Sequence, residues 1–103
     1  PRPAQPLTRR APAPGGNALD LHGRRVLVVE DEAVLAQALI ASLSALGAEV
    51  VGPAGSLEDA LSLAATAPGL DAAVLDVNLA GRFSFPVADV LAGRGVPTVF
   101  ATG

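Results

Sequence analysis

The chain contains no cysteine, which excludes a disulfide scaffold and a metal site built on thiolates. Its one histidine, His22, lies at the edge of the predicted folded part, so neither a histidine-based catalytic site nor a zinc site is expected. Lysine is missing altogether, and the arginines do not cluster outside the N-terminal segment. With a net charge of −3, this composition argues against a nucleic-acid-binding surface.

Long apolar runs are missing as well. No run approaches the roughly 20 residues of a membrane span, and the N-terminal segment lacks the apolar centre of a signal peptide. We therefore expect no contact with a membrane and a cytoplasmic location. Half of the 103 residues are nevertheless hydrophobic, which suits one small packed domain rather than a disordered chain.

The composition divides the chain into two regions. Residues 1–23 include the stretch "PRPAQPLTRRAPAPGG", which is rich in Pro, Ala and Arg and has no periodic apolar face. This composition is typical of an extended linker or a disordered leader. Residues 24–103 carry the apolar periodicity of a folded domain.

Strand and helix patterns alternate through the folded region. Short apolar runs predict strands at residues 26–29, 48–51, 71–76 and 97–103, the second stopped by Gly52-Pro53. Helical spacing predicts helices at 32–47, 56–67 and 87–92, the second opened by Ser56 with Asp59 three residues later. This order predicts an α/β fold, a doubly wound parallel sheet with helices on both faces.

Polar side chains follow three of the predicted strands, and ligand sites in such sheets form at the carboxyl ends of the strands. Glu30 and Asp31 end the first strand, Asp76 ends the third and Thr102 ends the fourth. If the first and third strands are neighbours, the three carboxylates converge and repel one another. A hard divalent cation relieves the repulsion, so the pattern predicts a small acidic Mg²⁺ pocket with a hydroxyl and a nucleophilic carboxylate.

Each of these residues also has a simpler interpretation. Asp31 alone could cap the following helix, and Asp76 alone could be a turn residue. Thr102 could be a solvated strand end, and Glu32 suits the first turn of the helix without any further role. The coincidence of three strand ends favours a site.

At these residues the sequence resembles the receiver domains of bacterial two-component response regulators. The motifs are "VLVVEDE", "AAVLDVNL" and "VPTVFATG", and the resemblance spans about Arg24 to Gly103. It implies a flavodoxin-like sheet with strand order 2-1-3-4. "VFATG" resembles the FAT GUY subgroup, which commonly works with HWE or HisKA2 histidine kinases, as single-domain proteins or as the C-terminal receiver of a hybrid kinase.

The resemblance implies a role for each residue at the strand ends. Asp76 matches the aspartate that accepts the phosphoryl group, and Thr102 matches the switch hydroxyl. Asp31 would bind Mg²⁺ directly and Glu30 through water, while Asn78 matches the position whose backbone carbonyl completes the metal site. The chain would then be a signalling receiver loaded from a phosphohistidine, with kinase activity only if a kinase is fused to it.

The sequence departs from the family after Gly103, where receivers continue with a fourth helix, a fifth strand carrying a lysine, and a fifth helix. We therefore expect the chain to be a piece of a longer one rather than a natural short form. Its fourth strand would then be an open edge, so that the chain by itself pairs in a homodimer or larger oligomer or is only marginally folded. A phosphorylation-poor docking or dimerisation module is the alternative. A haloacid-dehalogenase-like phosphotransferase fits poorly, because Asn78 and not a second aspartate follows Asp76 at two residues, and no phosphate-binding turn supports a flavin.

Overall fold

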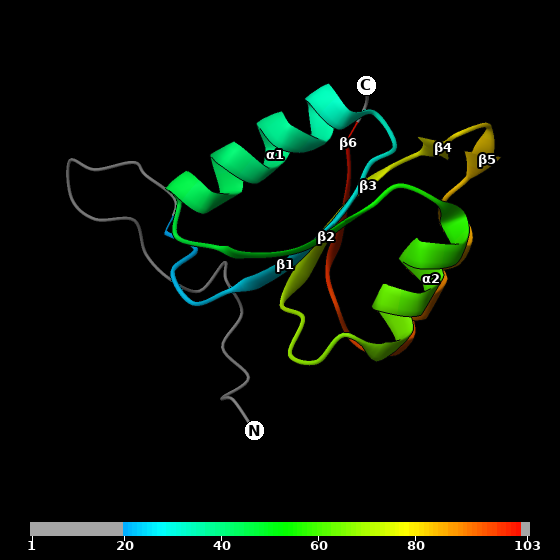
Figure 1. Ribbon diagram of the computed structural model, residues 1–103. Helices are drawn as coiled ribbons and strands as arrows, with labels where there is room; N and C mark the ends of the chain where they lie inside the picture. Colours follow the sequence, from blue (N-terminus) through cyan, green and yellow to red (C-terminus); the bar gives the residue numbers. More distant parts are fainter. Residues whose placement is uncertain (1–19, 102–103) are drawn as a thin grey trace.

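The computed structural model describes residues 20–101, which form a parallel sheet with helices on both faces (Figure 1). The strands pair in the order β2-β1-β3-β6, where the bounds are β1 (Arg25–Val29), β2 (Glu49–Ala54), β3 (Ala72–Asp76) and β6 (Thr98–Ala101). The helices are α1 (Ala33–Ala45), α2 (Leu57–Thr66) and α3 (Phe85–Gly93). The predicted α/β fold is confirmed. The predicted strand order 2-1-3-4 is also the observed one, because β6 is the fourth strand of this sheet along the chain.

The main core lies between the sheet and the pair α2 and α3. Side chains alternate between the faces of a strand, so Leu27 and Val29 of β1 and Leu75 of β3 share one face. All three are completely buried, together with Val87 and Leu91 of α3. Small alanines of α2 fill the rest of this layer, which brings α2 close to the sheet.

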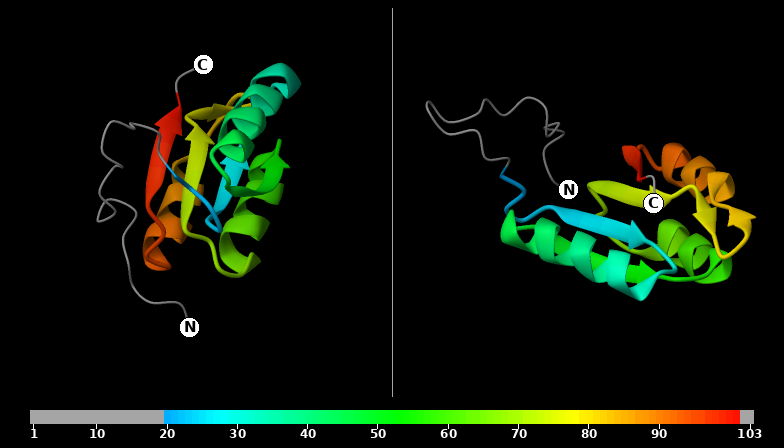
Figure 2. Two further views of the ribbon diagram at one scale, coloured as in Figure 1. Left: turned by 90° about the vertical axis from the view of Figure 1, so that its left-hand side faces the viewer. Right: turned by 90° about the horizontal axis from the view of Figure 1, so that it is seen from above.

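Among the described elements, α1 alone covers the opposite face of the sheet, on the side of β1 and β2 (Figure 1). Val26 and Val28 of β1 are buried there. The register carries this face across to Val99 of β6, which is 62% exposed. Figure 2 shows β6 at the edge of the sheet, where α1 does not reach it.

The helix signals in the sequence are mostly reproduced. The Ser56 hydroxyl caps α2 by accepting a hydrogen bond of 3.1 Å from the Asp59 amide, as predicted. The third helix starts two residues earlier than predicted, with Pro86 in its first turn. None of the helices in the described part is long and apolar enough to cross a bilayer.

The described chain begins before the predicted domain boundary. Leu21 is 5% exposed, and its amide donates a hydrogen bond of 2.8 Å to the Leu46 carbonyl at the end of α1. Leu21 therefore packs with the folded part, although the sequence assigns it to the leader. The division at residue 23 stays a prediction in other respects.

Strand β2 does not stop at Gly52-Pro53, so that prediction was wrong. The strand continues to Ala54, and the register shifts by one residue there, because the three steps of β2 from Val51 to Ala54 lie opposite the two steps of β1 from Leu27 to Val29. A proline lacks the N–H that a central strand needs, but β2 is an edge strand of the described sheet and tolerates it. Gly52 has a φ of 102°, which few residues with a side chain adopt.

A two-stranded hairpin, β4 (Asn78–Leu79) and β5 (Arg82–Phe83), follows β3 and was not predicted. Its two-residue turn has positive φ at both positions, 54° at Ala80 and 85° at Gly81. This turn type usually carries Asn or Asp before Gly. With Ala80 in that position, the sequence lacks the dipeptide that would have predicted a hairpin. Leu79 anchors the hairpin because its side chain is completely buried.

We predict that Gly52→Ala destabilises the fold by about 2 kcal/mol or more, because a residue with a side chain is strained at this φ. A Cβ at Gly52 would also lie 2.8 Å from the Val28 carbonyl oxygen and 2.9 Å from the Ala54 amide nitrogen. Urea unfolding followed by circular dichroism measures the loss. Gly93→Ala is the control, because no atom lies within 4 Å of a Cβ there; equal stabilities of the two variants would contradict the argument.

Candidate functional site

The parallel pairing of β1 with β3 brings three carboxylates together at one end of the sheet. Val29 pairs with Leu75, so the next residues, Glu30 and Asp76, leave neighbouring strands at the same level. One carboxylate oxygen from each of Glu30, Asp31 and Asp76 lies within 4.8 Å of the others. The convergence that the sequence predicted is present in the structure.

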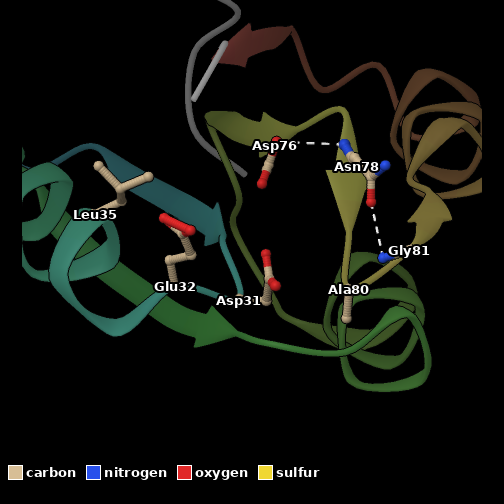
Figure 3. Close-up of a pocket in the computed structure, with 7 residues that line it drawn as sticks. All are labelled: Asp31, Glu32, Leu35, Asp76, Asn78, Ala80 and Gly81. Carbon is tan, nitrogen blue, oxygen red and sulfur yellow. Dashed lines mark hydrogen bonds between the residues drawn. The ribbon is translucent and has the colours of Figure 1, made fainter.

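A pocket of about 300 Å³ opens at this point. Figure 3 shows the carboxylates of Asp31 and Asp76 directed into the same space from the ends of their two strands. Glu30 is only 4% exposed and joins the cluster from the buried side. The lining residues are Asp31, Glu32, Leu35, Asp76, Asn78, Ala80 and Gly81.

The interpretation of Asp31 as a helix cap is wrong. The N-cap residue of α1 is Glu32, and no side chain makes a capping hydrogen bond there. Glu32 was expected in the first turn and lies one position before it. The Asp31 carboxylate is exposed and directed at the pocket, so it is left free for a cation.

Asp76 does act as a turn residue, in addition to lining the pocket. Its Oδ1 accepts a hydrogen bond of 3.3 Å from the Asn78 amide. The Asn78 side chain is occupied elsewhere, because its Oδ1 accepts a hydrogen bond of 2.8 Å from the Gly81 amide (Figure 3). In an extended residue the N–H and the C=O lie on the same side, so the Asn78 carbonyl faces the side of Asp76.

The β4–β5 hairpin is the part of the site that the sequence did not predict. Its turn residues Ala80 and Gly81 form one wall of the pocket. Arg82 fixes the hairpin to α2 through an ion pair with Glu58 at a distance of 2.5 Å. The signal that the sequence offered was Gly81, six residues before the predicted third helix, and a glycine does not specify a turn type by itself.

The acidic cluster perturbs the titration of its most buried member. Burial raises the pKa of the Glu30 carboxyl above its ordinary value of 4.5, and the nearby carboxylates of Asp76 and Asp31 raise it further. The hydrogen bond of 3.2 Å from the Glu32 amide acts in the opposite direction and lowers the pKa. The net direction is upward, so the ionised cluster is destabilised as long as no cation joins it.

This donor set fits Mg²⁺. Three carboxylates from two strands, a backbone carbonyl and an opening to water are the ligands that this hard cation takes in proteins. Thr102 lies outside the described residues, so its predicted place at the fourth strand end stays a prediction.

No protein-family model matches the chain, and no curated protein does. Solved structures do match. SdrG from Pseudomonas melonis Fr1, in its BeF3-activated conformation, is 44% identical with a TM-score of 0.64, over 77% of this chain and 67% of that one. The signal receiver domain of a modulated diguanylate cyclase from Desulfovibrio desulfuricans G20 is 34% identical with a TM-score of 0.65, over 78% and 65%. The response regulator PhyR from Brucella abortus is 28% identical with a TM-score of 0.67, over 74% and 32%.

The chain belongs to the receiver domains of response regulators. It spans 32% of the PhyR chain and 65% of the Desulfovibrio receiver, so it corresponds to part of those proteins. The resemblance that the sequence motifs indicated is confirmed at the level of the receiver domain and of signal transduction. In this receiver, the acidic pocket occupies the carboxyl ends of β1 and β3.

We predict that Glu30→Gln raises the melting temperature of the Mg²⁺-free receiver at neutral pH. The raised pKa means that protonated Glu30 stabilises the fold at low pH, and this contribution is lost as the pH rises through the raised value. Two charges about 4 Å apart repel by about 1 kcal/mol even in water. Removing one should therefore raise Tm by roughly 4–8 °C in a domain of this size.

Thermal melts in EDTA and in excess MgCl₂ test this prediction. The variant should also lose most of the stabilisation that Mg²⁺ gives the wild type. Glu49→Gln is the control, because Glu49 is ion-paired with Arg25 at the start of β1 and β2 and does not line the pocket. A lower Tm for Glu30→Gln in EDTA, with an unchanged response to Mg²⁺, would show that the cluster does not repel.

Proposed function

We propose that this receiver accepts a phosphoryl group on Asp76 from a phosphohistidine of a partner histidine kinase. Mg²⁺ would be held by the carboxylates of Asp31 and Asp76 and by the backbone carbonyl of Asn78, with Glu30 joining through water. Thr102 supplies the hydroxyl that turns toward the phosphoryl group. The observation that carries the proposal is the convergence of the three carboxylates at the carboxyl ends of β1 and β3.

The chemistry follows from the position of the Asp76 carboxylate. One of its oxygens attacks the phosphorus, the phosphorus–nitrogen bond of the phosphohistidine breaks, and the imidazole leaves and takes up a proton. Asp76 is then an acyl phosphate, with more negative charge and three new acceptor oxygens. Bound Mg²⁺ would screen the charge of the transferring group, and the remaining task of the protein is to position it.

The Asp76 carboxylate is suited to this task by its surroundings. The carboxylate is half-buried, and its Oδ1 accepts a hydrogen bond from the Asn78 amide. These contacts restrict the side chain to one rotamer, so little conformational entropy is lost when it reacts. The pocket opens to solvent beside it and admits a phosphate-sized group. The receiver is not an enzyme acting on a separate substrate in this proposal, because it modifies its own side chain.

The "VFATG" motif supports assignment to the FAT GUY subgroup, and hence a kinase of the HWE or HisKA2 type as partner. We propose a bacterial cytoplasmic setting for the same reason. A receiver at the C-terminal end of a hybrid kinase would keep the same site, since all of its carboxylates come from the described domain.

We predict that acetyl phosphate or phosphoramidate with Mg²⁺ labels the wild-type chain and that Asp76→Asn abolishes the labelling. A phosphate-affinity gel separates the two forms. Asp89→Asn is the matched control, because Asp89 is an exposed aspartate of α3 outside the pocket lining. Labelling that persists in Asp76→Asn would refute the assignment of the acceptor, and labelling that survives an excess of EDTA would refute the metal.

A docking or dimerisation module is a second candidate function, favoured by the surface of β6. Among the described strands β6 is an edge, and it carries no charged side chain. Val99 is 62% exposed and Phe100 39% exposed. Unprotected, uncharged edges pair readily with other strands, and a second copy of the chain offers an identical edge.

We predict that the 103-residue chain is a dimer or larger oligomer in solution and that Val99→Lys shifts it toward the monomer. A lysine on an edge strand opposes pairing with another strand. Light scattering coupled to size exclusion measures the mass. Val34→Lys is the control, because Val34 is even more exposed but lies on α1. A monomeric wild type with a cooperative melt would rule out pairing through β6.

A further inference from the structure

We propose that Ser84 is a positioning residue for the phospho-acceptor. Its side chain does not line the pocket and is completely buried. Its hydroxyl holds the peptide unit that follows the Asp76 side chain, so that the Asp76 carboxylate and the Asn78 carbonyl face the same cation. This inference rests on the proposed function. It adds to the proposed site a residue that contacts the main chain of Asp76 and does not line the pocket.

Ser84 binds two successive carbonyls at the end of β3. The Ser84 Oγ donates a hydrogen bond of 2.5 Å to the Asp76 carbonyl oxygen. The Ser84 amide donates a second one of 2.9 Å to the Val77 carbonyl oxygen. The carbonyl of Ser84 in turn accepts from the Val87 amide at 2.9 Å in the first turn of α3. One residue therefore joins the main chain at the acceptor to the start of a packed helix.

The alternative use of a serine at this position is visible elsewhere in the chain. Ser84 and Ser56 both occupy the N-cap position of a helix. Ser56 has extended backbone angles and accepts from the Asp59 amide, which is the usual capping arrangement. Ser84 has φ −90° and ψ 6° and makes no side-chain cap, because its hydroxyl is directed at Asp76. The Ser84 hydroxyl is thus committed to the acceptor strand rather than to its own helix.

This bond matters because the two groups that face the cation are two residues apart on one short segment. The peptide unit is planar, so holding the Asp76 carbonyl sets the direction in which the chain continues toward Asn78. Within the described residues, the one hydrogen bond that joins Asp76 directly to Asn78 is that of 3.3 Å from the Asn78 amide to the Asp76 Oδ1, which is long. Mg²⁺ requires near-octahedral ligands at about 2.1 Å, so a small rotation of this segment removes a ligand.

The test compares Ser84→Ala with Ser84→Thr in the full chain. Ser84→Ala should raise the Kd for Mg²⁺, measured by calorimetry or NMR titration, by roughly 10-fold, as partners of metal ligands do. It should also slow the labelling by acetyl phosphate at saturating Mg²⁺. Ser84→Thr keeps the hydroxyl and should restore most of both values.

Ser56→Ala is the matched control for a general loss of stability. It removes the cap of α2 and lowers Tm without touching the segment from Asp76 to Asn78. Its Mg²⁺ affinity and labelling rate should equal those of the wild type. An equal loss in Ser56→Ala, or wild-type Mg²⁺ affinity in Ser84→Ala, would overturn the role of Ser84.

The outcome for the wild type separates this inference from the proposed function. A wild-type chain that binds no Mg²⁺ contradicts both, whereas wild-type binding that Ser84→Ala retains contradicts only the positioning role. If Ser84→Ala does not fold, an NMR titration of the wild type with Mg²⁺ tests the positioning role instead. Its Asp76 carbonyl carbon and Ser84 amide should then shift with Mg²⁺ along the same isotherm as the Asn78 amide, and unshifted signals would overturn the inference.

Discussion

The register between β1 and β3 is the constraint on which the rest of the molecule depends. Val29 opposite Leu75 places Glu30 and Asp76 side by side, and a slip by one residue would turn every core side chain of one strand to the other face. The core therefore fixes the site. Leu27, Val29 and Leu75 are completely buried on the face of α2 and α3, so hydrophobic burial holds three carboxylates together against their repulsion.

The contacts of the backbone around Asp76 hold the acceptor in place despite the repulsion between the carboxylates. The segment from Asp76 to Ser84 is tied down by the Ser84 hydroxyl, by the Asn78 side chain on the Gly81 amide and by the buried Leu79. These contacts order the main chain without neutralising any carboxylate. The cluster is left as a preformed set of acceptor oxygens, a surface that favours a small divalent cation over an organic ligand.

The sequence predicted the fold because its signals are local and regular. Unbroken apolar runs mark the central strands, and Ser56 with Asp59 marks a helix start that the structure reproduces. The approach of Glu30, Asp31 and Asp76 followed from the rule for parallel strands. The hairpin after Asp76 was missed because Ala80 takes a left-handed backbone conformation, which alanine rarely adopts and which its residue type therefore does not predict. The bond from Ser84 to Asp76 was missed because a serine before a helix normally indicates a cap.

A cluster of exposed aromatic side chains lies close to the phospho-acceptor Asp76. The aromatic residues Phe83, Phe85 and Phe100 pack on one another at the surface, with ring centroids 5.6 and 5.7 Å apart, and all three are substantially exposed. Phe100 is opposite Leu75, and the next rung of the ladder pairs Ala101 with Asp76. A strand or helix that covers β6 would thus bury aromatic surface one rung from the acceptor. Because β6 supports β3 on the side away from β1, the order of this edge contributes to the rigidity with which Asp76 is held.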